Sequence, residues 1–467
     1  MSSLLIINKK DNVGVSLKAT SKVKIGHKVA LKDIKKGTSI IKYGEVIGVA
    51  KNNIKKGDLV HSHNIASHLN QKFTYSYHPH LNKIKKENNY FLGYKRKNGR
   101  AGIRNDIYLI PTVGCVNSLA VTLKNKAKKL PLGTIDNIYA FTHQFGCSQL
   151  GEDHNDFKKL LVSLALNPNA TYVIFIGLGC ENNQISAIKE LLKPYKRDNI
   201  FFYNAQEVDD DVKYGFNLLK KLIAKASKLK RSKVSLSELT IGLKCGGSDA
   251  FSGLTANPKV GEVSDKVIAS GGSSVLTEVP EMFGAEQILM NKCINKEVYK
   301  KYLKLITDFK KYYTDLGFPV YENPSPGNKE GGITTLEEKS LGCITKAGST
   351  PIVDVLDYTQ IVKKSGLNVL NGPGNDLIAA TALAASGAQL VLFTTGRGTP
   401  FVTVVPTIKI ATNKRLATHK KNWIDFDAET NSSDQLFKLV VDVISGKYKT
   451  KQEDHGEIAF FKKGVTL

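Results

Sequence analysis

Residues 244–249 bring together several side chains that could do chemistry. They read Lys244-Cys245-Gly246-Gly247-Ser248-Asp249 and follow a short apolar run. An apolar run of this length predicts a buried strand, and the paired glycines predict a tight turn after it. The turn would place an ammonium, a thiol, a hydroxyl, a carboxylate and backbone N–H groups in one small space. This combination suits a carboxylated or metal-bound ligand, although a buried cysteine at such a turn is also common in an ordinary core.

Three histidines near the N-terminus form a second candidate site. His61 and His63 are one residue apart, so on a strand they would point to the same face, and His27 lies in the same small module. We expect His27, His61 and His63 to hold a metal ion or an anion, because neutral imidazole is a common metal ligand. The alternative is a polar strand end with solvated histidines.

The chain uses arginine sparingly, which makes its arginines informative. Only seven of the 67 basic residues are arginines, and three of these fall within residues 96–104. Arginine offers a planar, bidentate fork for a carboxylate, so we expect Arg100 and Arg104 to bind a substrate carboxylate, with Arg397 after a later strand in the same role. A turn held by ion pairs would explain the same cluster.

The net charge of +25 raises the question of a nucleic-acid partner. The positive charge comes mainly from lysines that are scattered along the chain, whereas nucleic-acid readers gather arginine-rich patches. We therefore expect no nucleic-acid partner, and interpret the lysines as solvated surface that also attracts anionic small molecules. A basic nucleic-acid-binding protein remains the alternative that the charge alone suggests.

The six cysteines are far apart in the sequence, and no secretory signal is visible. Reduced thiols in a cytoplasmic protein are expected from this pattern rather than a disulfide framework. The most apolar tract, residues 377–393, is interrupted by polar residues, so the sequence predicts no membrane span.

The order of predicted elements indicates an α/β protein with a small all-β module in front. Strands and helices alternate from about residue 106, which favours parallel, helix-covered sheets. The expected divisions are a β module at 1–75, a linker at 76–92, a first α/β catalytic domain at 93–292, and a second α/β region with a C-terminal tail at 293–467.

Several reactive residues come directly after predicted strands. In parallel sheets, ligands bind beyond the carboxyl ends of the strands. The residues in question are His143, Cys147, Cys180, Glu181, Lys244, Cys245 and Arg397. Three of them, Cys147, Cys180 and Cys245, are an alternative metal site, since three thiolates would suit an iron–sulfur cluster.

At this point the chain resembles the altronate dehydratase/galactarate dehydratase family of sugar-acid hydro-lyases. The matching segments run in order along nearly the whole chain: 26–30, 61–64, 93–105, 179–181, 244–249, 323–328 and 395–400. The resemblance implies that the β module is a β-clip of the SAF type. It also implies an iron- or manganese-dependent dehydration of a sugar acid to a 2-keto-3-deoxy acid, with Fe²⁺ or Mn²⁺ as cofactor.

Such a reaction needs a base, a proton donor and groups that bind the substrate carboxylate. The expected roles are as follows: His143 or Lys244 as base; Asp249 or Glu181 as proton donor or orienting group; Arg100, Arg104, Ser248 and Arg397 in substrate binding; and His27, His61 and His63 as metal ligands. The partner is then a small-molecule sugar acid, and a homo-oligomer is compatible with the sequence. Galactarate dehydration and sulfolactate sulfo-lyase activity are the alternative reactions in the same family.

Overall fold

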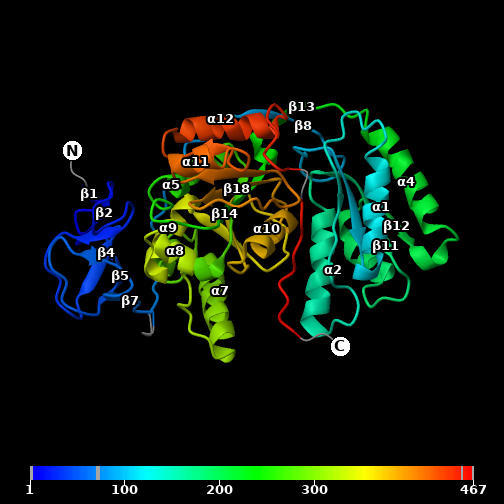
Figure 1. The fold of residues 1–467 in the computed structure, drawn as a ribbon. Helices are drawn as coiled ribbons and strands as arrows, with labels where there is room; N and C mark the ends of the chain where they lie inside the picture. The colour runs from blue at the N-terminus through cyan, green and yellow to red at the C-terminus, as the bar shows by residue number, and fades with distance from the viewer. Residues whose placement is uncertain (1–3, 70–73, 454–455, 465–467) are drawn as a thin grey trace.

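The structure is a computed structural model that describes residues 4–69, 74–453 and 456–464. It divides into a small β module, a seven-stranded parallel sheet and a four-stranded parallel sheet, which lie side by side in that order (Figure 1). This confirms the predicted α/β class with an all-β N-terminal module. None of the helices in the described part of the chain is both long and apolar enough to cross a membrane.

The β module consists of two small antiparallel sheets. One has the order β1-β2-β3-β6 (Leu4–Leu5, Val13–Ser16, Lys28–Ala30, Leu59–Val60), and the other has the order β4-β5-β7 (Ser39–Lys42, Glu45–Ala50, Ile65–Ala66). Two similar turn sequences around Ile34 and Ile54 join their ends through a pair of backbone hydrogen bonds of 2.8 Å. Gly37 and Gly57, three residues after each isoleucine, both have positive φ, which glycine adopts without steric cost.

The segment that follows the module lies along the seven-stranded part of the molecule. His80 N–H donates to Asn291 O, and Glu87 N–H donates to Ala269 O. The segment ends in β8 (Tyr90–Gly93), which pairs antiparallel with β13 (Ser232–Ser235). The expected linker at 76–92 is therefore an extended, hydrogen-bonded strap.

The four-stranded sheet has the order β10-β9-β11-β12 and all its strands are parallel (Ile138–Ala140, Asp106–Pro111, Ala170–Gly177, Ile200–Asn204). Alternate residues of β9 pack on opposite faces, as the two-residue period of a strand requires. Ile107 and Leu109 pack with α1 (Asn117–Ala127) and α4 (Asp211–Ala226), whereas Tyr108 and Ile110 pack with α2 (Gly151–Ala165) and α3 (Ile185–Leu192).

The seven-stranded sheet has the order β16-β17-β15-β14-β18-β19-β20, and its strands are parallel as well (Ile352–Leu356, Gly366–Leu370, Ser273–Leu276, Thr240–Cys245, Leu390–Thr395, Thr407–Ala411, Phe426–Asp427). Its helices are α5 (Ala256–Ala269), α6 (Glu286–Met290), α7 (Lys296–Asp315), α8 (Pro326–Glu330), α9 (Leu336–Ile344), α10 (Asp376–Ala385), α11 (Lys414–His419) and α12 (Ser433–Ile444). The division expected at residues 292/293 runs through this sheet, because β14 and β15 precede it and pair with β18 and β17.

The C-terminal tail closes the gap between the two parallel sheets. It runs between α10 and α2 (Figure 1). There Phe460 packs against Phe157 of α2, and the N–H of Lys463 donates to Asp153 of the same helix. The tail therefore joins the two α/β units.

Candidate active site at the carboxyl end of the seven-stranded sheet

Lys244, near the end of β14, is the centre of a buried group of charges. Its ammonium is fully buried and donates to the backbone oxygen of Cys245 at 2.8 Å and to Asp376 at 2.7 Å. It also forms a close ion pair with Glu278. Each partner comes from the end of a strand or the loop after it, since Glu278 follows β15 and Asp376 follows β17.

These partners determine the charge of Lys244. Burial alone would lower its pKa, but attraction to Glu278 and Asp376 outweighs burial and raises the pKa above its ordinary value. Lys244 is therefore a permanent ammonium and not a ready base, which differs from the role expected for it. A fixed ammonium in a dry site can stabilise negative charge that develops on a substrate.

Glu278 is a second central residue, and the sequence did not single it out for a role. It is fully buried, its Oε2 accepts the N–H of Cys245 at 3.0 Å, and it forms an ion pair of 3.2 Å with Lys346. Burial and the charge of Glu281 raise its pKa, although Lys244 and Lys346 oppose this rise. Its backbone has φ 70°, an uncommon conformation that functional sites often hold. A buried carboxyl with a raised pKa is a candidate for proton transfer.

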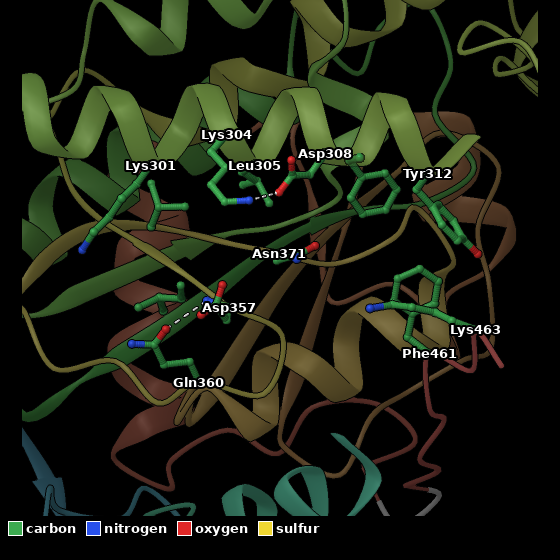
Figure 2. Close-up of a pocket in the computed structure, with 13 residues that line it drawn as sticks. Lys301, Lys304, Leu305, Asp308, Tyr312, Asp357, Gln360, Asn371, Phe461 and Lys463 are labelled. Carbon is green, nitrogen blue, oxygen red and sulfur yellow. Dashed lines mark hydrogen bonds and ion pairs between the residues drawn. The ribbon is translucent and has the colours of Figure 1, made fainter. Parts of the chain in front are cut away.

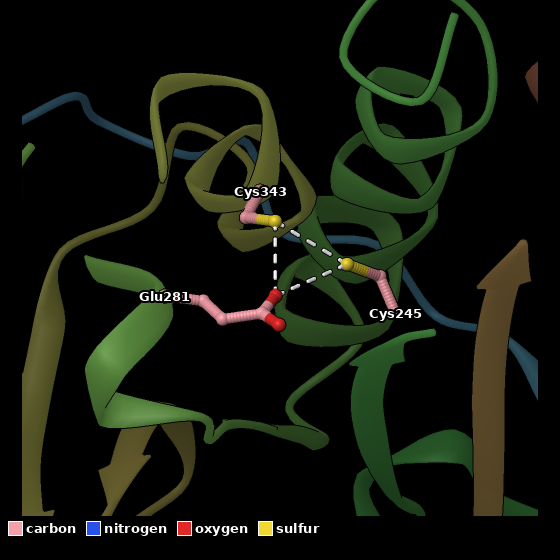
Figure 3. Close-up of side chains that lie close together, drawn as sticks. All are labelled: Cys245, Glu281 and Cys343. Carbon is pink, nitrogen blue, oxygen red and sulfur yellow. Dashed lines mark hydrogen bonds between the residues drawn. The ribbon is translucent and has the colours of Figure 1, made fainter. Parts of the chain in front are cut away.

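Three further side chains of this site form a compact set with the donors of a metal site: Cys245, Glu281 and Cys343 (Figure 3). The two sulfurs are 3.3 Å apart, and Glu281 Oε2 lies 3.1 Å from Cys343 Sγ and 3.5 Å from Cys245 Sγ. The hydrogen bond between the thiols lowers the pKa of Cys245 and raises that of Cys343. Burial would raise the pKa of Glu281, but Lys339 at 2.8 Å and the other lysines lower it.

This set fits a divalent transition metal. Two thiols and a carboxylate are donors that suit Fe²⁺ or Zn²⁺. The surrounding charges also balance, because the ammonium groups of Lys244, Lys339 and Lys346 face the carboxylates of Glu278, Glu281 and Asp376. A dication that replaced the two thiol protons would leave this balance unchanged.

Three of the expected site residues lie beside this group. Ser248 Oγ is 3.1 Å from Cys245 Sγ, which places its hydroxyl at the metal set. Asp249 is buried and accepts hydrogen bonds from Phe251 N, Thr412 Oγ1, Ser252 Oγ and Asn413 Nδ2, so it fixes the loop after β14. Burial raises the pKa of Asp249. Arg397, in the loop after β18, has a side chain 45% exposed and its Cβ lies close to Gly247.

The N-terminal module packs on the same region through a buried ion triad. Lys28 and Lys42 each lie 2.8 Å from a carboxylate oxygen of Glu338 on α9, with all three side chains buried. Lys42 and Tyr43 line a small cavity together with Ser248, Asp249 and Cys343. The module is thereby held against the loop that carries Ser248 and Asp249.

Comparison with known proteins identifies the family of this chain. Three family models match it in order: the altronate/galactarate dehydratase SAF domain at 4–68, the second domain of D-galactarate dehydratase/altronate hydrolase at 93–227, and the C-terminal D-galactarate/altronate dehydratase domain at 236–466. The chain belongs to the galactarate/altronate dehydratase family. This confirms the resemblance found in the sequence.

Relatives in this family cover essentially the whole chain. An altronate dehydratase of Bacillus subtilis (strain 168) is 47% identical, with 100% of both chains covered. An altronate dehydratase of Escherichia coli (strain K12) is 46% identical and covers 98% of this chain and 94% of its own. The β subunit of a (2R)-sulfolactate sulfo-lyase from Chromohalobacter salexigens is 32% identical, with 77% of this chain and 93% of that one covered.

The histidines of the SAF module do not form the compact metal set that was expected. The His27 and His61 rings stack with centroids 5.3 Å apart, and His61 Nε2 lies 2.9 Å from Lys329 O, while His63 is exposed. Among the described residues, the group whose ligand atoms lie within 4.8 Å of one another is Cys245, Glu281 and Cys343. Burial lowers the pKa of both His27 and His61, so the pair favours neutral rings at the contact with α8.

Arg100 and Arg104 lie at the opposite end of the sheets from the Lys244 group. Arg100 donates to Thr240 and Ser273, the first residues of β14 and β15. Arg104 is buried, forms a bidentate pair with Glu453 at 2.6 and 3.0 Å, and donates to Val443 O. Both arginines hold the fold together, which was the alternative explanation for their clustering, and neither is placed to bind substrate beyond the strand ends.

His143, Cys147, Cys180 and Glu181 belong to the four-stranded sheet and are separate from the Lys244 group. His143 is buried, its Nε2 donates to Pro111 O at 2.8 Å, and its Nδ1 accepts the N–H of Phe145. Burial lowers its pKa to about 4, so it is a neutral structural ring. Glu181 accepts from Thr112 Oγ1, Leu178 N and Gly179 N, and it fixes the loop that carries Cys180.

A cavity in the described structure lies to one side of the site. It has a volume of about 500 Å³ and opens beyond β16 and β17, between α7 and the C-terminal tail (Figure 2). Lys301 and Lys304 of α7 line it, opposite Asp357 and Gln360, and Lys463 and Phe461 line it from the tail. The Lys244 group does not line this cavity.

Proposed function

We propose that this protein is a hydro-lyase that removes water from altronate and forms a 2-keto-3-deoxy acid. The observation that carries the proposal is the identity of 47% and 46% to two altronate dehydratases along the full length of the chain. The buried charges around Lys244 support it, because they supply the groups that such a reaction needs.

The reaction breaks the C2–H bond next to the carboxylate and expels hydroxide from C3. The electron pair of the C–H bond forms the C2–C3 double bond, and the enol that results becomes the 2-keto group. Negative charge builds up on the substrate carboxylate when the proton leaves. The ammonium groups of Lys244 and Lys346 lie where they can stabilise this charge without having to reorganise.

We assign proton transfer to Glu278, because its carboxyl lies in the Lys244 group, is buried and has a raised pKa. Arg397 would bind the substrate carboxylate from the exposed side of the site, where Asp376 is also 41% exposed. Ser248 would bind a substrate hydroxyl, while Asp249 positions the loop that carries Ser248. Cys245, Glu281 and Cys343 would hold Fe²⁺ in preference to Mn²⁺, because two of the three donors are thiols, and the bound ion would supply a Lewis acid for the substrate oxygens.

The test is turnover by protein purified without oxygen. Altronate, galactarate and sulfolactate are supplied separately, before and after a chelator, and iron or manganese is then added back. We expect altronate to be the best substrate, the chelator to abolish turnover, and Fe²⁺ or Mn²⁺ to restore it. The Cys343→Ala variant should bind the metal with an affinity at least about tenfold lower than that of the wild type. Failure to convert any of the three acids under every metal condition would overturn the proposal.

A preference for sulfolactate would instead assign the chain to the other branch of the family, for which the 32% identical relative is the evidence.

We also propose a cytoplasmic location, because the free thiols of the site need a reducing environment. Fractionation of cells that express the tagged chain tests this location.

A further inference from the structure

The three exposed cysteines of the chain lie at one edge of the four-stranded sheet. Cys115, Cys147 and Cys180 are exposed, whereas the other three cysteines are buried. Cys115 follows β9, Cys147 follows β10 and Cys180 follows β11, and these three strands are neighbours in the order β10-β9-β11. Unpaired cysteine is usually buried as a small apolar residue, so three exposed thiols at one sheet edge call for a function.

Hydrogen bonds tie the three cysteine loops to one another. The N–H of Gly114 donates to Phe145 O at 2.9 Å, which joins the first loop to the second. The N–H of Asn183 donates to Gly146 O at 3.0 Å, and that of Ser148 donates to Asn182 Oδ1 at 2.9 Å, which join the second loop to the third. The loops thus form one fixed surface.

Each cysteine follows a glycine, and the glycines allow the loops to approach closely. A side chain at Gly146 would collide with Thr112 O, and one at Gly114 would come within 2.9 Å of His143 O. Gly146 and Gly179 also have positive φ, of 102° and 127°. The strand-Gly-Cys pattern thus recurs after three neighbouring strands, and each of its thiols is exposed.

The loops that carry the three cysteines lead into helices. Three helices begin just after the cysteines: α1 at Asn117, α2 at Gly151 and α3 at Ile185. Their N-termini carry partial positive charge, which stabilises anions nearby. Gln206, from the loop after β12, also points its Nε2 at Cys180 Sγ at 3.7 Å. Amide donors of this kind tune thiolate-bound metal centres.

The three thiols do not form the tight set that a single metal ion needs. Neighbouring strands are about 4.8 Å apart, so loops after three adjacent strands span roughly 10 Å. A single zinc ion would need all three sulfurs within about 4 Å of one another. Among the described residues, Cys115, Cys147 and Cys180 do not form such a set, since the one group within 4.8 Å is the Cys245 set.

We propose that Cys115, Cys147 and Cys180 bind an iron–sulfur cluster of the [4Fe–4S] type. Three thiolates hold three of its irons, and the fourth iron stays open to an oxygen ligand from solvent or from a small carboxylate. This site corrects the expected cysteine set, because Cys115 takes the place of Cys245, which lies in the other sheet. It does not rest on the proposed dehydration of altronate.

The test is reconstitution of the full chain with ferrous iron and sulfide without oxygen, followed by iron and acid-labile sulfide analysis. We expect about four irons and four sulfides per chain from the cluster, beyond any single iron at the Cys245 set, and a broad visible charge-transfer absorption. Cys115→Ser, Cys147→Ser and Cys180→Ser should each lose most of this content, and the triple variant all of it. The control is Cys293→Ala, a buried cysteine outside both sites, which should load fully.

Alkylation of the wild-type protein keeps the proposal testable if the serine variants fold poorly. Loading should protect Cys115, Cys147 and Cys180 from a thiol reagent, as read by mass spectrometry of peptides, and leave any other reactive thiol unprotected. The proposal is overturned if loading with iron and sulfide gives no acid-labile sulfide on the wild type, if Cys115, Cys147 and Cys180 bind only zinc, if the triple variant keeps its cluster, or if loading leaves the three cysteines unprotected. Altronate turnover is measured in a separate assay, so a protein that fails to convert altronate can still confirm or contradict the iron–sulfur cluster.

Discussion

Glu278 is the residue at which the proposed chemistry is tested most directly. Glu278→Gln keeps the shape of the side chain and removes its proton-transfer capacity, so kcat should fall by about 10²–10⁴-fold with little change in KM. The cause is the loss of a buried carboxyl whose pKa burial and Glu281 raise. Steady-state kinetics and thermal unfolding of the same sample check it.

The control for this variant is Glu286→Gln. Glu286 is also a buried carboxylate that is paired with a lysine, Lys310 at 2.5 Å, but it lies outside the Lys244 group. We expect this change to lower stability while kcat stays within about twofold of the wild type. Equal loss of kcat in both variants would show that Glu278 has only a structural role.

His143 gives a second prediction, on stability against pH. Burial lowers its pKa from 6.5 to about 4, so between these values the unfolded chain binds a proton that the folded protein does not. The contribution of the neutral His143 ring to the unfolding free energy is complete above pH 6.5. It falls by up to roughly 3 kcal/mol as the pH decreases towards 4. His143→Gln removes the titration, so its deficit in unfolding free energy relative to the wild type should shrink by that amount at pH 4. Urea titrations of both proteins above pH 6.5 and at pH 4 measure the unfolding free energies. A deficit of the variant that is the same at both pH values would contradict the prediction.

At the scale of elements, the sequence predicted individual strands and helices but not the pairing of strands that are far apart in the chain. The alternation of strands and helices from about residue 106 was predicted, because a strand or a helix is specified within a few residues. The pairing of β14 with β18 was not, since it joins residues about 150 positions apart and no short-range pattern encodes it.

The same limit applies to the site. Lys244, Cys245, Ser248 and Asp249 were found because they adjoin one another after a strand. Cys343 was not, since it lies 98 residues from Cys245 in the sequence and meets it only through the packing of α9. For Cys115, the strand-Gly-Cys pattern that it shares with Cys147 and Cys180 was a signal that could have been used.

The contact between the SAF module and α9 leads to a prediction at this scale. Glu338→Gln leaves the buried ammonium groups of Lys28 and Lys42 without their counter-charge, which costs about 3–5 kcal/mol. The module should then detach more often, and proteolysis within the strap at residues 76–92 should become at least about tenfold faster. Glu297→Gln, which removes an exposed ion pair on α7, is the control and should leave the rate unchanged. A strap that is cleaved equally slowly in both variants would show that the apolar contacts of the module suffice.

The net charge of +25 has its consequence at the scale of the whole molecule. Because the lysines are scattered, their combined field should attract any small anion instead of marking out one binding patch. Raising the salt from about 0.01 M to about 1 M shortens the Debye length from roughly 30 to 3 Å, so kcat/KM for altronate should fall by about tenfold. kcat itself should change little, since the buried pairs of Lys244 with Glu278 and Asp376 are screened far less than surface charges. Kinetics over a salt series, with a sucrose series of matched viscosity as control, separate these effects. A kcat/KM that does not respond to salt would mean that the groups of the site alone, Arg397 among them, bring in the acid.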